Sequence, residues 1–173
     1  MAFNPNIHHR QSIRLENYDY SAKGWYYVTL CEYNRDRHRF GNITNNKMTL
    51  SLWGEIVEEA WLMLPERFNQ IILDEFVVMP NHFHGILAIT ERRKDVCLGN
   101  IVGALKSVSA NYMLECFKET HPPDVIFGKV WQRNFHDEII RDDRHLDFVR
   151  QYIINNPRNW GNDEHNCPQN TDL

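Results

Sequence analysis

Two strand-like runs separated by a tight turn constrain this chain more than any other feature. Residues 71–79 and 82–90 are rich in apolar and β-branched side chains, and the Pro-Asn pair between them favours a turn. The second run begins His82-Phe83-His84. Because side chains alternate between the two faces of a strand, both imidazoles point to one face and Phe83 points to the other. The pattern therefore predicts a hairpin whose two histidines can bind one metal ion and leave open coordination positions, as a catalytic site requires.

A single domain of residues 1–173 is what the length allows, because two ordinary domains need a longer chain. We expect the polar residues from about 161 onward to form a flexible tail. Hydrophobic residues make up 42% of the chain, an ordinary value for a soluble globular protein. No apolar stretch approaches the ~20 residues of a membrane span, and the first residues lack a hydrophobic signal core. We therefore expect a cytoplasmic protein without a membrane partner.

The net charge of −4 argues weakly against a nucleic-acid partner. The distribution of charge softens that objection. Residues 51–80 contain six acids and one base, a balance of −5, whereas residues 81–110 contain four bases and two acids, a balance of +2. The histidine segment therefore lies in a mildly basic stretch, and a nucleic-acid partner stays compatible with the composition.

Hydrophobic periodicity and capping residues predict further elements on both sides of the hairpin. The expected elements are a strand at 25–33, a helix from Thr49 or Ser51 to about Leu64 with Pro65 as its stop, a helix at 99–118, a strand at 130–141, and a helix from Asp142 or Asp143 to the Asn-Pro pair at 156–157. Strands and helices in this order predict an α+β fold with an antiparallel sheet and helices packed on one face.

Tyr152 is the candidate for a reactive side chain in the last predicted helix. It lies beside the apolar stripe of that helix, at the margin of the buried face, because positions three or four apart share a face. Asn156, one turn later, presents an amide oxygen near the same place. With His82 and His84 it completes a set of two nitrogens and one oxygen, which suits Mg²⁺ or Mn²⁺ when a substrate phosphate supplies negative charge. The phenol of Tyr152 would then attack phosphorus and form a covalent link that a hydroxyl can later reverse.

These motifs resemble those of a known family. The heptapeptide Met79-Pro80-Asn81-His82-Phe83-His84-Gly85, followed by Tyr152 and Asn156-Pro157, resembles the HUH single-tyrosine transposases, and most closely the REP-associated tyrosine transposases of bacteria. The segments 130–133 and 140–143 are also similar to that subgroup, and the resemblance extends over residues 20–160. Many insertion-sequence relatives have glutamine where this chain has Asn156, so the asparagine favours the REP-associated branch.

The resemblance implies a ferredoxin-like sheet with the histidine pair on a central strand. It also implies cleavage of single-stranded DNA near a hairpin, leaving a 5′-phosphotyrosine and a free 3′-hydroxyl. It assigns the metal ligands to His82 and His84, the nucleophile to Tyr152 and the third ligand to Asn156. The implied protein is a metal-dependent single-stranded DNA endonuclease and strand transferase, a transposase-like enzyme associated with the nucleoid, which acts as a monomer or a homodimer.

Contacts to single-stranded or hairpin DNA are harder to derive, because charged side chains usually face solvent. The candidates are Lys106, Asn111, Gln132, Arg133, Arg92 and Arg93, together with the basic loop at 35–39. His136 is an auxiliary candidate beside the metal or the phosphate. Candidates for stacking on unpaired bases are Trp25, Tyr26 and Trp131.

Two other hypotheses fit the same residues. The chain could be a non-catalytic module that binds a nucleic-acid hairpin on the same fold, or a metal-dependent hydrolase of a small phosphoester in which Tyr152 only packs. The key side chains also have ordinary structural explanations: His82 and His84 as plain strand histidines, and Asn156 as a residue at a helix C-terminus.

Overall fold

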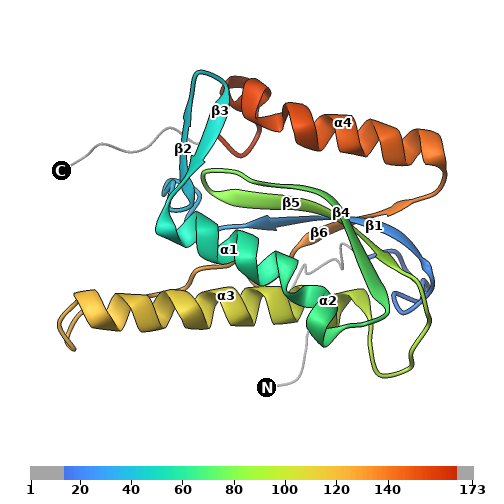
Figure 1. Cartoon of the computed structure of the whole chain (residues 1–173), viewed down its shortest axis with the longest axis horizontal. Helices are drawn as coiled ribbons and strands as arrows, with labels where there is room; N and C mark the ends of the chain where they lie inside the picture. The colour runs from blue at the N-terminus through green and yellow to red at the C-terminus, as the bar shows by residue number, and fades with distance from the viewer. Residues whose placement is uncertain (1–13, 167–173) are drawn as a thin grey trace, which may run out of the picture.

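A four-stranded antiparallel sheet forms the centre of the structure, a computed structural model that describes residues 14–166 (Figure 1). The strands are β1 (Gly24–Cys31), β4 (Ile71–Val78), β5 (His82–Ile89) and β6 (His136–Ile140). They lie in the order β4-β5-β1-β6, and each neighbouring pair is antiparallel. The strand that begins with the histidine pair, β5, therefore lies inside the sheet between β4 and β1.

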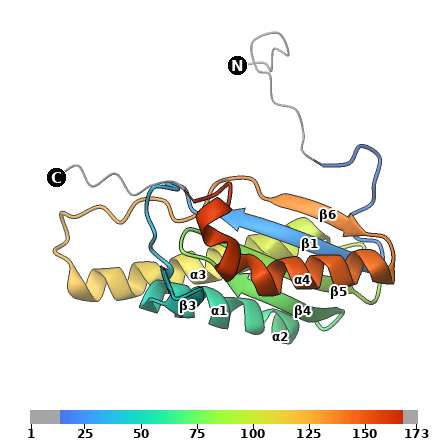
Figure 2. The same ribbon diagram turned by 90° about the horizontal axis from the view of Figure 1, so that it is seen from above.

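Helices cover both faces of the sheet, as Figures 1 and 2 show. One face carries α1 (Leu52–Leu62), the short α2 (Leu64–Arg67) and α3 (Leu98–Thr120), and the other carries α4 (Asp143–Asn159). A short helix, η1 (Trp160–Asn162), follows α4, and a separate hairpin of β2 (Gly41–Thr44) and β3 (Lys47–Leu50) contacts α4 through β3. Among the described residues, no helix has the length and apolar character to cross a membrane.

The element order β1-α1-β4-β5-α3-β6, with this order of strands, is the ferredoxin-like arrangement. The predicted α+β fold with an antiparallel sheet is therefore confirmed, as are the strand at 25–33, the histidine hairpin and the helix caps at Ser51 and Asp142.

Strand alternation divides the side chains of β5 between two cores. Phe83 points toward α1, where its ring lies 4.9 Å from that of Trp61. Gly85 follows on the same face, and a Cβ there would lie 2.8 Å from the Phe83 ring and 2.9 Å from Trp61. The glycine of the histidine motif therefore leaves room for these two aromatic side chains. His82 and His84 face the opposite side, where α4 lies.

The position of α4 corrects the expectation of helices on one face only. Its buried stripe of Leu146, Val149 and Ile153 packs in a second core with side chains on the far side of the strands, among them Tyr27 and Ile86. The β-strand period of two makes this possible, because β1 and β5 are apolar on both faces and can bury helices on each.

Several predicted boundaries differ from the structure. Within the strand expected at 130–141, only β6 forms, since residues 130–135 make a single isolated bridge, between Trp131 and Glu32. Pro65 does not end the helical region but stands in the first turn of α2, where its missing N–H costs nothing. Pro157 lies inside α4, near its end, so Asn156 is helical and buried rather than a terminal residue. The loss of one hydrogen bond in a final turn is evidently tolerated.

An ion pair ties α4 to the edge strand β4. The pairing of β4 with β5 is irregular between Leu73 and Phe76. From this irregular stretch, Asp74 accepts two hydrogen bonds from Arg150 of α4, from Nε at 2.8 Å and from Nη2 at 2.7 Å. The paired guanidinium lowers the pKa of the Asp74 carboxyl. A bidentate pair of this kind fixes the position of α4 along the sheet as well as adding stability.

We expect Asp74→Asn to lower the free energy of unfolding by about 1–2 kcal/mol, because it removes the charge from a bidentate hydrogen-bonded pair that is only partly exposed. Chemical denaturation measures this. The matched control is Glu75→Gln, which removes the same charge from the neighbouring exposed position. Equal unfolding free energies in the two variants would contradict the anchoring role of Asp74.

Candidate metal and tyrosine site

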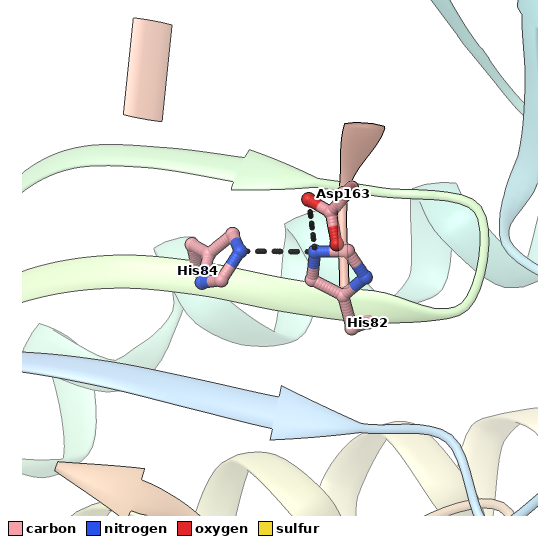
Figure 3. Close-up of side chains that lie close together, drawn as sticks. All are labelled: His82, His84 and Asp163. Carbon is pink, nitrogen blue, oxygen red and sulfur yellow. Dashed lines mark hydrogen bonds and ion pairs between the residues drawn. The ribbon is translucent and has the colours of Figure 1, made fainter. Parts of the chain in front are cut away.

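The two histidines of β5 converge on one point, as predicted (Figure 3). Both are buried, and their Nε2 atoms lie 2.9 Å apart. The strand geometry that sends both side chains to the α4 face therefore also brings one ring nitrogen of each toward the same place. This is the arrangement that a shared cation requires.

Asn81 fixes the tautomer of His82. Its Nδ2 donates to the backbone carbonyls of Arg35 and His165, each at 2.7 Å, so its Oδ1 must face Nδ1 of His82, which lies 2.9 Å away. That nitrogen must then carry the proton, and Nε2 keeps its lone pair. The sequence predicts position 81 only as a turn residue. In the structure Asn81 orients His82, in the way that hydrogen-bond partners orient metal-binding histidines.

His84 has hydroxyl partners instead. Its Nδ1 lies 2.6 Å from Oη of Tyr27 and 2.9 Å from Oγ1 of Thr29. A hydroxyl can donate or accept, so these contacts suit either tautomer of His84. In one tautomer, Nε2 of His84 donates to the lone pair on Nε2 of His82. In the other, the proton lies on Nδ1 of His84, which donates to a hydroxyl oxygen, and Nε2 is free to bind a cation.

Both imidazoles are neutral near pH 7. Burial lowers the pKa of His84 to about 3, helped by the nearby His165 and His136. Burial, followed by the neighbouring His84 and His165, lowers the pKa of His82 well below its ordinary value. Neutral imidazole is the form that binds a metal, so the site needs no deprotonation step to be ready for a cation.

A carboxylate from the C-terminal segment completes a group that could hold a metal. Oδ2 of Asp163, just after η1, lies 3.9 Å from Nε2 of His82, and the potential ligand atoms of Asp163, His82 and His84 all lie within 4.8 Å of one another (Figure 3). The next histidine, His165, lies beside His82 with the ring centroids 4.7 Å apart and the rings tilted by 57°. The sequence analysis treated residues from about 161 as a tail and so missed both groups, because no local pattern signals that this segment folds back over the sheet.

Tyr152 lies at the margin of the buried face of α4, as predicted, and is brought to the histidines. Its ring centroid is 5.5 Å from that of His84 and 6.2 Å from that of Tyr27, and 41% of the residue is exposed. Burial raises the pKa of the Tyr152 phenol, and Asp163 adds to this, while Asn156 and Tyr27 act in the opposite direction. The hydroxyl is therefore protonated at neutral pH.

Asn156 is almost fully buried, with 2% exposed, on the same helix one turn after Tyr152. Its Oδ1 has no hydrogen-bond partner among the described residues. An unpaired buried carbonyl oxygen is costly, and a functional ligand is one of the few explanations for it.

A cavity of about 420 Å³ opens beside this site. Its lining includes Tyr152, His84 and His136, and Glu164 and His165 line it as well. Of the predicted DNA contacts, Gln132 lines this cavity, and the exposed Arg133 lies next to it in the chain. Arg35 from the basic loop also lines it.

The other predicted DNA contacts lie elsewhere. Lys106 donates to the backbone carbonyls of residues 132 and 134, at 2.9 and 2.8 Å, so its ammonium holds the segment before β6 in place. Arg92 pairs with Asp19, Arg93 pairs with Asp95, and Asn111 is exposed on α3, which covers the opposite face of the sheet.

Of the three aromatic residues proposed for base stacking, two are buried and one is partly buried. Tyr26 is fully buried, and Trp131 is 8% exposed, both within the core on the α1 and α3 side. Trp25 packs against the second core. Their aromatic character reflects packing, since strands favour aromatic side chains for that reason alone.

The depressed pKa of His84 predicts a pH dependence of stability. Below about pH 6.5 the unfolded chain takes up a proton at this position that the folded chain does not, down to pH 3. The contribution is therefore fully present above pH 6.5 and is lost as pH falls, by about 2 kcal/mol at pH 5. Urea unfolding in EDTA at pH 7 and pH 5 measures it, and we expect the loss to be smaller in His84→Gln. The same loss in both proteins would show that His84 is not buried as a neutral group.

Comparisons with known proteins agree with this geometry. The family described as "Transposase IS200 like" matches residues 43–156, which include His82, His84, Tyr152 and Asn156. An uncharacterized protein of Haemophilus influenzae is 36% identical over 181 residues, covering 94% of this chain and 96% of that protein. The solved structure of a REP-associated tyrosine transposase bound to a REP hairpin has the same fold, with a TM-score of 0.62 at 18% identity over 86% of this chain and 75% of that one. With its family match spanning both histidines and the tyrosine, the chain belongs to the IS200-like transposases.

Proposed function

We propose that this protein is a metal-dependent single-stranded DNA endonuclease and strand transferase of the REP-associated type, with Tyr152 as its nucleophile. One observation carries the proposal: the Tyr152 ring lies 5.5 Å from that of His84 in the same chain, beside two histidine nitrogens that converge within 2.9 Å. A packing tyrosine needs no such neighbours. A phenol that attacks a phosphate held at a cation does.

The reaction is a transesterification. The Oη of Tyr152 bonds to phosphorus while the bond from phosphorus to the 3′-oxygen breaks; the phenolic proton passes to water, and the leaving 3′-oxygen takes a proton from water. The strand is left attached through its 5′-phosphate, with a free 3′-hydroxyl on the other piece. Because the ester bond is kept rather than hydrolysed, a second 3′-hydroxyl can reverse the step and join strands.

The cation would be Mg²⁺ or Mn²⁺, held by Nε2 of His82 and of His84. When bound, it polarises the phosphate and stabilises charge that develops on the leaving oxygen. The neutral state of both imidazoles supports this, since two neutral ligands leave the cation with charge to attract a phosphate. We propose Asn156 as the third ligand because its buried Oδ1 is unpaired among the described residues. Asp163 is the competing oxygen ligand, since its carboxylate and the histidine nitrogens all lie within 4.8 Å of one another.

The substrate would be single-stranded DNA adjoining a hairpin. The structural relative was solved with a REP hairpin bound, and the cavity beside Tyr152 is lined by Arg35 and Gln132. His136 lines the same cavity and is the auxiliary candidate for the phosphate. Tyr152 and the histidines lie in one chain, which supports action as a monomer, although a homodimer would keep the same site. A DNA substrate implies work at the nucleoid in the cytoplasm.

We expect the wild-type protein, incubated with Mn²⁺ and a labelled DNA hairpin with single-stranded flanks, to form a covalent protein–DNA adduct that survives denaturing electrophoresis. Tyr152→Phe should form none, a loss of at least a hundredfold, because the attacking oxygen is gone. The matched control is Tyr112→Phe, which changes an exposed tyrosine on α3, across the sheet from α4. It should form the adduct at the wild-type level.

The same assay separates the alternatives. Hairpin binding with no adduct in wild type would support a non-catalytic module. Turnover of a small phosphodiester that persists in Tyr152→Phe would support a hydrolase in which the tyrosine only packs.

The choice of third ligand is tested by Mn²⁺ affinity, measured by calorimetry with a non-cleavable hairpin and Tyr152→Phe as the background. We expect Asn156→Ala to weaken Mn²⁺ binding by roughly tenfold or more, in the range of losses seen for the shells of metal sites. Asn155→Ala is the control, since that side chain bonds the carbonyl of Gln151 instead. If Asp163→Ala weakens binding and Asn156→Ala does not, Asp163 is the ligand and the assignment of Asn156 fails.

A further inference from the structure

An exposed phenylalanine stands beside the proposed nucleophile without a packing role. Phe148 is 71% exposed, although α4 buries its apolar side chains Leu146, Val149 and Ile153. It lies one helical turn before Tyr152, and both line the cavity of about 420 Å³. A large aromatic side chain that lines a cavity together with a reactive group is a feature of ligand-binding sites.

The cavity is a groove between α4 and the edge strand β6. Its floor is set by the pairing of β1 with β6, which places Thr29 opposite His136 and Tyr27 opposite Glu138. Phe148 and Tyr152 stand along the α4 side. His145, three residues before Phe148, pairs with Glu138 at 3.1 Å and so links α4 to β6.

The lining of the groove also includes amide side chains. Gln132 and Asn134 line the cavity from the segment that precedes β6. Lys106 holds this segment by hydrogen bonds to its backbone carbonyls, and its own ammonium is thereby occupied. The amides are left as groups that can both donate and accept. An aromatic side chain and amides lining one groove is a combination that can bind an unpaired nucleobase, by stacking and by hydrogen bonds to its edge.

We propose that this groove is a base-binding subsite in which one unpaired nucleobase, adjacent to the scissile phosphate, stacks on Phe148 and meets Gln132 and Asn134 at its edge. The spacing agrees with that role, because residues four apart on a helix have Cβ atoms about 5–6 Å apart. A nucleotide whose phosphate lies at Tyr152 thus carries its own base, or its neighbour's, to Phe148. Arg35, which also lines the groove, supplies a positive charge for the backbone. The inference rests on the proposed function for its substrate.

The test measures single-strand binding by the full-length Tyr152→Phe protein, which cannot form an adduct. The probes are fluorescein-labelled dT12 and a twelve-unit abasic strand with the same phosphates, followed by anisotropy at fixed salt. We expect Phe148→Ala to weaken dT12 binding by about tenfold and to leave abasic binding unchanged, since one stacked base is lost and no phosphate contact is. Phe148→Trp should bind dT12 as tightly as the parent or more so.

Ile154→Ala is the matched control, because it shortens a half-exposed apolar side chain on the same helix that does not line this cavity. It should leave both affinities unchanged. Unfolding in urea should show that Phe148→Ala is as stable as its parent, since the side chain is mostly in water.

Two results would overturn the subsite: dT12 and the abasic strand binding equally well to the parent protein, or Phe148→Ala weakening both probes alike. The adduct assay with wild-type Tyr152 keeps the two proposals distinguishable. Base binding that depends on Phe148, with no adduct in the wild type, would support the subsite and contradict the proposed nuclease. If Phe148→Ala forms the adduct normally and binds the substrate with unchanged affinity, the nuclease is supported and the subsite is contradicted.

Discussion

The period-two alternation of β5 is the constraint on which the rest of the structure depends. Phe83 turns into the core beneath α1, where Gly85 leaves it room, and this fixes the strand's register against its neighbours. The same register sends His82 and His84 to the other face with their Nε2 atoms 2.9 Å apart. A shift of one residue would turn both histidines toward α1 and Phe83 toward α4, so the packing of Phe83 in the first core enforces the geometry of the histidine pair.

The second requirement is that α4 rests on that polar face in one position only. Its apolar stripe alone would allow it to slide, because stacked aliphatic side chains are not directional. The bidentate pair between Arg150 and Asp74 supplies the direction. The Arg150–Asp74 pair and the packing of the second core together fix the position of α4, which places Tyr152 beside His84. The site thus depends on a residue of the edge strand, Asp74, that touches none of the reacting groups.

A buried pair of neutral imidazoles is costly to charge and ready to bind a cation. Asn81 holds the proton of His82 away from the convergence point, and the hydroxyls beside His84 can serve either tautomer. The histidines contribute no negative charge, and Asp163 is the one carboxylate in the group that could hold a metal among the described residues. A cation bound by the histidines would seek an anionic partner, and a phosphodiester is one. This electrostatic argument joins the site to a nucleic-acid substrate even though the whole chain carries a net charge of −4.

The sequence alone determined what depends on local spacing. Two histidines two residues apart in a strand must share a face, and the capping residues Ser51 and Asp142 begin helices. The position of Tyr152 at the margin of the buried face follows from its place beside the apolar stripe of its helix. Tertiary structure decided what depends on distant contacts. The carbonyls of residues 35 and 165 orient the amide of Asn81 toward His82. Lys106, predicted as a DNA contact, donates to backbone carbonyls of the segment before β6. Only the structure shows that Asp163 lies beside the histidines and that Phe148 is exposed at the cavity. No local pattern encodes such meetings, because the residues that create them lie far apart in the chain and are brought together by the burial of other side chains.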